Sequence, residues 1–188
     1  MRAITFTLTL LGLLVFHGHA EPPPGYQLAW SDEFDGAQLD ATNVPEAVNV
    51  ADGKLTITTY TEEGKHFTGM ISTKGLYESA HGYWEARIDF DDSPGMWSAF
   101  WSQTPTIGNP IDDPAKAGME IDFVEHRSHD HDGKGIAMTV NHTLHWNGYG
   151  RSTKAAARRR PTSTSATVFT SMRASGRIKS IASSWMES

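Results

Sequence analysis

Hydrophobic and polar residues alternate along much of this chain with the two-residue period of a β-strand. The clearest alternation runs from Lys54 to Thr61. Four later segments show the same pattern: His81–Phe90, Met96–Ser102, Gly118–His126 and Ile136–Trp146. Turn-forming residues separate them, and no segment has the pattern of a long amphipathic helix. The chain is therefore predicted to form an all-β fold, an antiparallel sandwich.

The alternation also assigns faces to individual side chains. In the segment 81–90, Trp84 and its apolar partners at every second position are expected to face a core, while Arg87 lies on the opposite face, outward or toward a cleft. Trp97 and Trp101 share one face of the next strand. His145 shares the polar face of the last one. Arg87, Trp97, Trp101 and His145 are therefore candidate ligand contacts.

The segment Met119–His126 combines three carboxylates with apolar residues. Glu120 and Asp122 share a face of a regular strand, but Glu125 would point to the opposite face. One extra residue at Phe123–Val124, a β-bulge, restores the phase and brings all three carboxylates to one surface. Such a surface is either a catalytic group or a solvated acidic face, and this stretch alone favours neither.

The ends of the chain differ from its body. Met1–Ala20 has a basic start, an apolar run and a small-residue cleavage pattern, which predicts a secretory signal peptide cut near Ala20. Residues 21–25, with three prolines, form a stiff linker. Residues 26–150 form the predicted domain. Residues 151–188 are rich in Ser, Thr and Arg, and this composition predicts a disordered basic tail.

Charge and composition limit the classes of partner that the chain can bind. The first 150 residues hold 8 Lys and Arg against 21 Asp and Glu, whereas residues 151–188 hold 8 against 1. An acidic body argues against nucleic acid as the partner. For the basic tail, binding to acidic polymers or membranes is the less favoured alternative to a purely disordered segment. The chain has no cysteine, so an exported protein of this kind depends on packing or bound ions for stability.

Two carboxylates braced by a third match the needs of glycoside hydrolysis, in which a retaining enzyme places its two catalytic carboxyls about 5–5.5 Å apart. Tryptophan rings suit the C–H faces of sugars. A metal-dependent hydrolase is the competing hypothesis, because His126, His129, His131, His142 and His145 lie among acids. The sequence contains no metalloprotease helix motif, nucleophile elbow or phosphate loop.

Five stretches in order resemble glycoside hydrolase family 16, of the laminarinase and agarase type. They are Trp30–Gly36, Val50–Ile57, Gly82–Arg87, Pro94–Trp101 and the E-x-D-x-x-E motif Glu120–Glu125. The resemblance implies a jelly-roll β-sandwich with a substrate cleft and a retaining mechanism on β-linked glucans or galactans. It implies that Glu120 is the nucleophile, Asp122 the assisting carboxylate and Glu125 the acid/base. It further places Trp97, Trp101 and His145 in the cleft.

The resemblance ends near Gly150, where further strands of such a sandwich are expected. We therefore expect a domain that is incomplete at its C-terminal end, poorly stable and weakly active or inactive, with residues 151–188 read from another frame. The alternative function is a non-catalytic, lectin-like sandwich that binds polysaccharide. We expect a secreted monomer without a cofactor, although a structural calcium ion is compatible with this fold. The sequence does not determine the sugar, the linkage or the oligomeric state.

Overall fold

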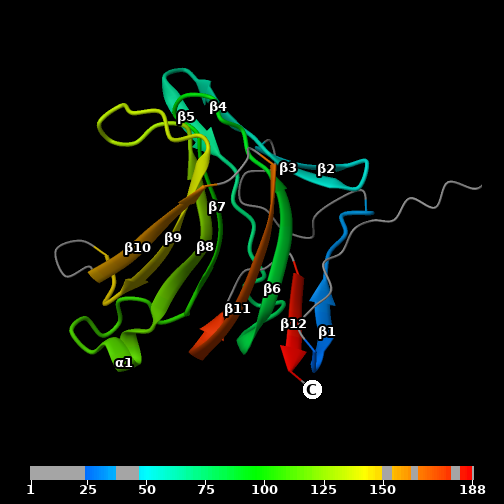
Figure 1. Ribbon diagram of the computed structural model, residues 1–188, viewed down its shortest axis with the longest axis vertical. Coiled ribbons are helices and arrows are strands. Elements are labelled where there is room, and N and C mark those ends of the chain that lie inside the picture. The colour runs from blue at the N-terminus through cyan, green and yellow to red at the C-terminus, as the bar shows by residue number, and fades with distance from the viewer. Residues whose placement is uncertain (1–23, 37–46, 150–153, 162–164, 179–182, 188) are drawn as a thin grey trace, which may run out of the picture.

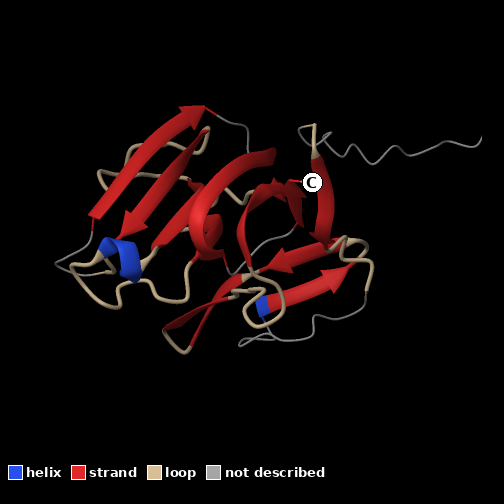
Figure 2. Ribbon diagram, turned by 90° about the horizontal axis from the view of Figure 1, so that it is seen from below, coloured by secondary structure: helices blue, strands red, loops and turns tan. Residues whose placement is uncertain are grey.

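The computed structural model describes residues 24–36, 47–149, 154–161, 165–178 and 183–187. Strands make up most of this part of the chain (Figure 2). The elements are β1 Tyr26–Ser31, β2 Val48–Ala51, β3 Lys54–Ile57, β4 Thr59–Glu62, β5 Lys65–Thr68, β6 Ser79–Asp89, β7 Trp97–Gln103, α1 Pro114–Ala117, β8 Met119–Arg127, β9 Thr139–Trp146, β10 Lys154–Pro161, β11 Ser165–Ile178 and β12 Ser183–Glu187. Within these ranges no helix is long and apolar enough to cross a bilayer.

Two four-stranded sheets form the body of the fold (Figure 1). One has the order β1-β12-β6-β11 and the other β10-β9-β8-β7, and all their pairings are antiparallel. Two separate hairpins, β2-β3 and β4-β5, lie at one end. The predicted all-β sandwich is confirmed, since the two sheets enclose one core of apolar side chains.

One predicted strand is divided. The alternation from Lys54 to Thr61 predicts a single strand, but Thr58 breaks it into β3 and β4, which belong to different hairpins. The Thr58 amide donates a hydrogen bond to the Ala47 carbonyl, 2.8 Å away, instead of continuing a ladder. Alternation of side chains does not report where the backbone changes its hydrogen-bond partner.

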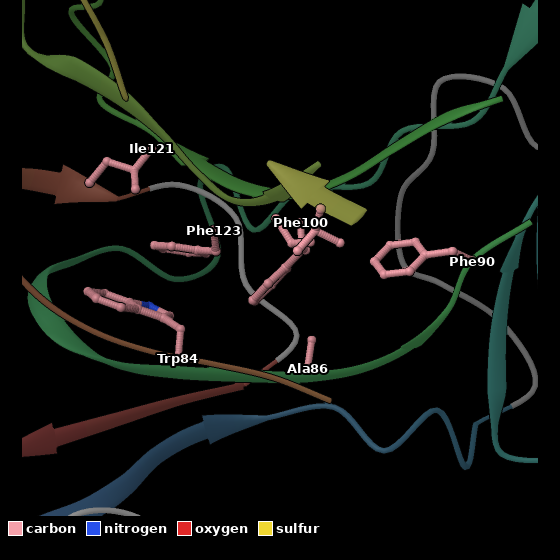
Figure 3. Close-up of a cluster of buried hydrophobic side chains, with 8 residues drawn as sticks. Trp84, Ala86, Phe90, Phe100, Ile121 and Phe123 are labelled. Carbon is pink, nitrogen blue, oxygen red and sulfur yellow. The ribbon is translucent and has the colours of Figure 1, made fainter. Parts of the chain in front are cut away.

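Aromatic and aliphatic side chains from both sheets form the core (Figure 3). The Trp84 ring of β6 stacks on Phe123 of β8, with ring centroids 5.4 Å apart, and Phe100 of β7 packs against Phe123 at 5.2 Å. The buried members of the cluster are Trp84, Ala86, Phe90, Phe100, Ile121, Phe123, Val124 and Val140. Phe123 therefore joins the two sheets from the same strand that carries the carboxylates.

The segment that the composition predicts to be disordered contains three strands. β10 pairs with β9 along its whole length, from Lys154 opposite Trp146 to Pro161 opposite Thr139. β11 pairs with β6, and β12 lies between β1 and β6. The prediction of disorder rested on weak hydrophobic periodicity, but ladder pairing satisfies backbone N–H and C=O groups at open sheet edges whatever the side-chain pattern.

Candidate active site

The predicted bulge is present in β8. Against β7, Phe100 is opposite Val124 and Trp101 is opposite Asp122, so Phe123 has no partner in this register. Against β9, the register also shifts between Asp122 and Glu125. Phe123 and Val124 are both buried in the core, 2% and 1% exposed. The extra residue lets two successive side chains point inward and returns Glu125 to the face of Glu120 and Asp122.

Glu120 receives two neutral hydrogen-bond donors on one oxygen. Gln103 Nε2 lies 2.7 Å from Glu120 Oε2, and the Tyr149 hydroxyl donates to the same oxygen. Gln103 Nε2 is also 2.6 Å from the Tyr149 hydroxyl. Glu120 Oε1 lies 4.0 Å from His145 Nε2. The two donors on Oε2 fix the orientation of the carboxylate and leave Oε1 on the side of His145.

Glu125 is held by one aromatic and one hydroxyl donor. Trp97 Nε1 lies 2.9 Å from Oε1, and the Thr143 hydroxyl donates to Oε2. A hydroxyl group can donate to an ionised carboxylate and accept from a protonated one. The Thr143 contact can therefore persist while Glu125 gains or loses a proton.

Asp122 lies between the two glutamates along the strand and is 6% exposed. Burial, followed by the negative charges of Glu125 and Glu120, raises the pKa of the Asp122 carboxyl to about 7. His145 Nε2 lies 3.3 Å from Asp122 Oδ2. Near pH 7 the Asp122 carboxyl is therefore about half protonated, while Glu120 keeps its two donors.

The raised pKa of Asp122 gives a testable dependence of stability on pH. Between about pH 4, where an unfolded Asp ionises, and about pH 7, the folded protein holds a proton on Asp122 that the unfolded chain has released. The contribution of this group to the free energy of unfolding therefore falls as the pH rises through this window, and it is level above it. In urea unfolding, we expect the free energy of unfolding of Asp122→Asn minus that of wild type to increase from pH 4 to pH 8. A constant difference would contradict the assignment.

The structure brings most of the sequence-predicted site residues to one face. Trp97 contacts Glu125, Trp101 is half-buried in the register position opposite Asp122, and His145 is opposite Glu120. Arg87 is not brought there. It is exposed on β6, in the other sheet, and it alternates with the core residue Ala86. Arg87 therefore faces away from the core on the far sheet. The prediction was wrong because alternation along one strand does not say which sheet that strand joins.

Three contacts of the glutamates were not singled out from the sequence. Gln103 continues the face of Trp97 and Trp101 by the same two-residue period, and this signal could have found it. Thr143 likewise shares the face of His145. Tyr149 follows the end of β9, so no strand period reports its direction.

A turn beyond β9 positions Tyr149. Asn147 and Gly148 both have positive φ, 64° and 74°. Asn147 Oδ1 accepts from the Asp112 amide at 2.5 Å, and Asn147 Nδ2 donates to Asp112 Oδ1 at 3.0 Å. A Cβ on Gly148 would lie 2.7 Å from the Cα of Gly108. The loop after β7 and the turn after β9 thus lock together, and the Tyr149 hydroxyl, whose pKa is raised first by burial and then by its hydrogen bond to Glu120, reaches the site.

The histidines are dispersed. Within the described ranges, one group could hold a metal ion: Glu120, Asp122 and His145, whose ligand atoms all lie within 4.8 Å of one another. His126 Nε2 is instead 2.7 Å from the Ala137 carbonyl oxygen, and His142 Nδ1 is 2.5 Å from that of Phe123. The cluster that suggested a metal-dependent hydrolase therefore does not converge on one point.

Comparison with known proteins identifies relatives of this site and fold. The sequence profile described as "Glycosyl hydrolases family 16" matches residues 35–171, which extends beyond Gly150. The endo-1,3-1,4-beta-glycanase EglC of Rhizobium meliloti (strain 1021) is 31% identical over 157 residues, covering 77% of this chain and 30% of that protein. The endo-1,3-1,4-beta-glycanase ExsH of the same organism is 33% identical over 86 residues, covering 46% of this chain and 16% of that protein. The chain thus spans less than a third of the length of these curated relatives.

Solved structures share the fold. The laminarinase catalytic domain from Thermotoga maritima MSB8 superposes with a TM-score of 0.56 at 23% identity, covering 78% of this chain and 70% of that one. SCLam, described as a non-specific endo-beta-1,3(4)-glucanase, superposes with a TM-score of 0.61 at 18% identity, covering 90% and 83%. At these identities the likeness establishes a jelly-roll sandwich, as the sequence predicts.

Proposed function

The chain belongs to glycosyl hydrolase family 16, and from this we propose that it is a retaining endo-glycosidase that cleaves β-linked polysaccharide. The observation that carries the proposal is the bulged strand β8, which presents Glu120, Asp122 and Glu125 on one face, each with its own polar side-chain partner. A retaining mechanism requires one carboxylate that attacks and one carboxyl that exchanges a proton.

Two displacements complete the proposed reaction. In the first, Glu120 Oε1 forms a bond to the anomeric carbon while the glycosidic C–O bond breaks, and Glu125 gives its proton to the departing oxygen. In the second, Glu125 takes a proton from water, whose oxygen attacks the anomeric carbon and releases Glu120. Formation of the ester removes the charge of Glu120, one of the charges that raise the pKa of Asp122, so the electrostatics of Asp122 change between the two steps.

The substrate class follows from the relatives and from the surface beside Glu125. The relatives are named endo-1,3-1,4-beta-glycanase and endo-beta-1,3(4)-glucanase, which makes β-1,3-glucan and mixed-linkage glucan the first candidates. Agar-type galactan, which the sequence resemblance allows, is the second candidate. Trp97 is 60% exposed and donates to Glu125. Arg127 lies over the ring, 4.4 Å from its centroid. The opposite ring face would offer a stacking platform for a sugar next to the acid/base. We also propose export, which the pattern of Met1–Ala20 supports.

Reducing-end release tests the proposal. The purified chain is incubated with laminarin, mixed-linkage β-glucan and agarose, and early products are sized by chromatography. We expect oligosaccharides of several lengths from a β-glucan, the pattern of an endo-acting enzyme. Polysaccharide retention without any product would favour the lectin-like alternative instead. The same assay, together with a thermal melt, tests the expectation of weak activity and low stability.

A further inference from the structure

The bulge in β8 sets the spacing of the two catalytic glutamates, so whatever holds the bulge also holds the active site. Phe123 has no register partner on β7 or β9, and Phe123 and Val124 together face a single residue of β9, His142. A bulge interrupts the ladder that would otherwise fix the strand locally. A side chain that bonds the bulge can replace this lost restraint.

His142 makes such a bond. Its Nδ1 lies 2.5 Å from the carbonyl oxygen of Phe123. A carbonyl oxygen can only accept, so Nδ1 carries the hydrogen and donates it. The contact crosses from the middle of β9 to the extra residue of β8, the single position that shifts the phase between Asp122 and Glu125.

The His142 ring lies at the surface rather than in the core. The side chain is exposed, and it borders a cavity of about 390 Å³ whose lining also includes Ile121, Phe123, Leu144 and Arg158. Beside this space, the hydrogen bond to the Phe123 carbonyl is the polar contact that orients the ring. The space also means that side chains of other shapes fit at position 142 without clashing.

We propose that His142 is a positioning residue that clamps the β8 bulge through the Phe123 carbonyl and thereby sets the distance between Glu120 and Glu125. His142 touches neither glutamate, and its effect passes through the backbone of Phe123–Glu125. This inference rests on the proposed function, in which these two carboxyls act on one glycosidic bond. Because small displacements of catalytic groups lower rates steeply, loss of the clamp is expected to lower kcat more than it raises KM.

Two variants of nearly equal size separate the hydrogen bond from shape. Asparagine places a donor close to the position of histidine Nδ1, whereas leucine fills similar space without a donor. We expect His142→Leu to lower kcat on a β-glucan by about tenfold or more with KM within a factor of about two, and His142→Asn to restore most of kcat. Equal activity of His142→Leu and wild type, or equal loss in both variants, would overturn the clamp.

Hydrogen exchange gives a readout that does not depend on catalysis. The amides of Phe123, Val124 and Glu125 are expected to exchange faster in His142→Leu than in wild type and His142→Asn, while amides of the β4-β5 hairpin keep their rates in all three. This measurement decides the inference even if the wild-type chain hydrolyses nothing, a result that would count against the proposed function alone. Unchanged exchange at the bulge in His142→Leu would overturn the clamp.

Discussion

Glu120→Gln is expected to lower kcat on a β-glucan by on the order of 10⁴-fold or more, because it removes the proposed nucleophile, on which both displacements depend. The amide keeps the size of the side chain and leaves an oxygen that Gln103 and Tyr149 can still bond. KM and the melting temperature are therefore expected to change little. Initial rates of reducing-end release across a series of substrate concentrations measure kcat and KM, and a thermal melt measures the melting temperature.

A matched control and a chemical test accompany this variant. Glu62→Gln makes the same chemical change at an exposed position of the β4-β5 hairpin and should keep wild-type activity. Azide can attack from the side that Glu120 vacates in the smaller Glu120→Ala, giving a glycosyl azide of inverted configuration from an activated substrate. If Glu120→Gln keeps more than a tenth of the wild-type kcat, Glu120 is not the nucleophile.

Glu125→Ala is expected to lower kcat on polysaccharide by about 10²–10⁴-fold, since a general acid and base contributes this much. The loss should be far smaller in the first displacement for a dinitrophenyl glycoside, whose leaving group departs without a proton. Azide should rescue this variant with retained configuration, because it attacks the ester on Glu120 from the face of the absent carboxyl. Comparison of burst and steady-state rates on the two substrates separates the steps.

The opposite configurations of the two azide products make the assignment of Glu120 and Glu125 specific. If Glu125→Ala loses activity equally on both substrates, or if azide gives the inverted product, Glu125 is not the acid/base. Removal of Glu125 also leaves Trp97 Nε1 and the Thr143 hydroxyl without their present acceptor, so the melting temperature of the variant is measured beside its kinetics.

The bulged strand β8 could be predicted from the sequence, because the spacing of its three acids does not fit a regular strand. Three carboxylates cannot share a face of a regular strand at positions 120, 122 and 125, and apolar Phe123 and Val124 mark where the extra residue falls. Alternation put Trp97 and His145 on one face of their strands, and the family resemblance assigned that face to the cleft. Period-two patterns are local, and these residues lie on strands adjacent to β8.

Features set by long-range pairing escaped the same method. Arg87 has the alternation of a cleft residue, but β6 belongs to the other sheet. Tyr149 reaches Glu120 through positive-φ backbone at Asn147 and Gly148 and their lock to the loop at Asp112 and Gly108. The strands β10, β11 and β12 form where open edges of β9, β6 and β1 accept them, although their composition resembles that of a disordered segment. Backbone hydrogen bonding and backbone conformation determine these features, and side-chain patterns do not record either of them.

Covalent labelling identifies the residue that forms the glycosyl-enzyme. A 2-deoxy-2-fluoro β-glucoside or β-glucan oligosaccharide with a dinitrophenyl leaving group slows the second displacement, so the glycosyl-enzyme accumulates and its position can be mapped by peptide mass spectrometry. We expect one added glycosyl unit on Glu120, absent from Glu120→Gln and present in Glu62→Gln. A label on Asp122 or Glu125, or hydrolysis of the glycoside without a labelled peptide, would contradict this expectation.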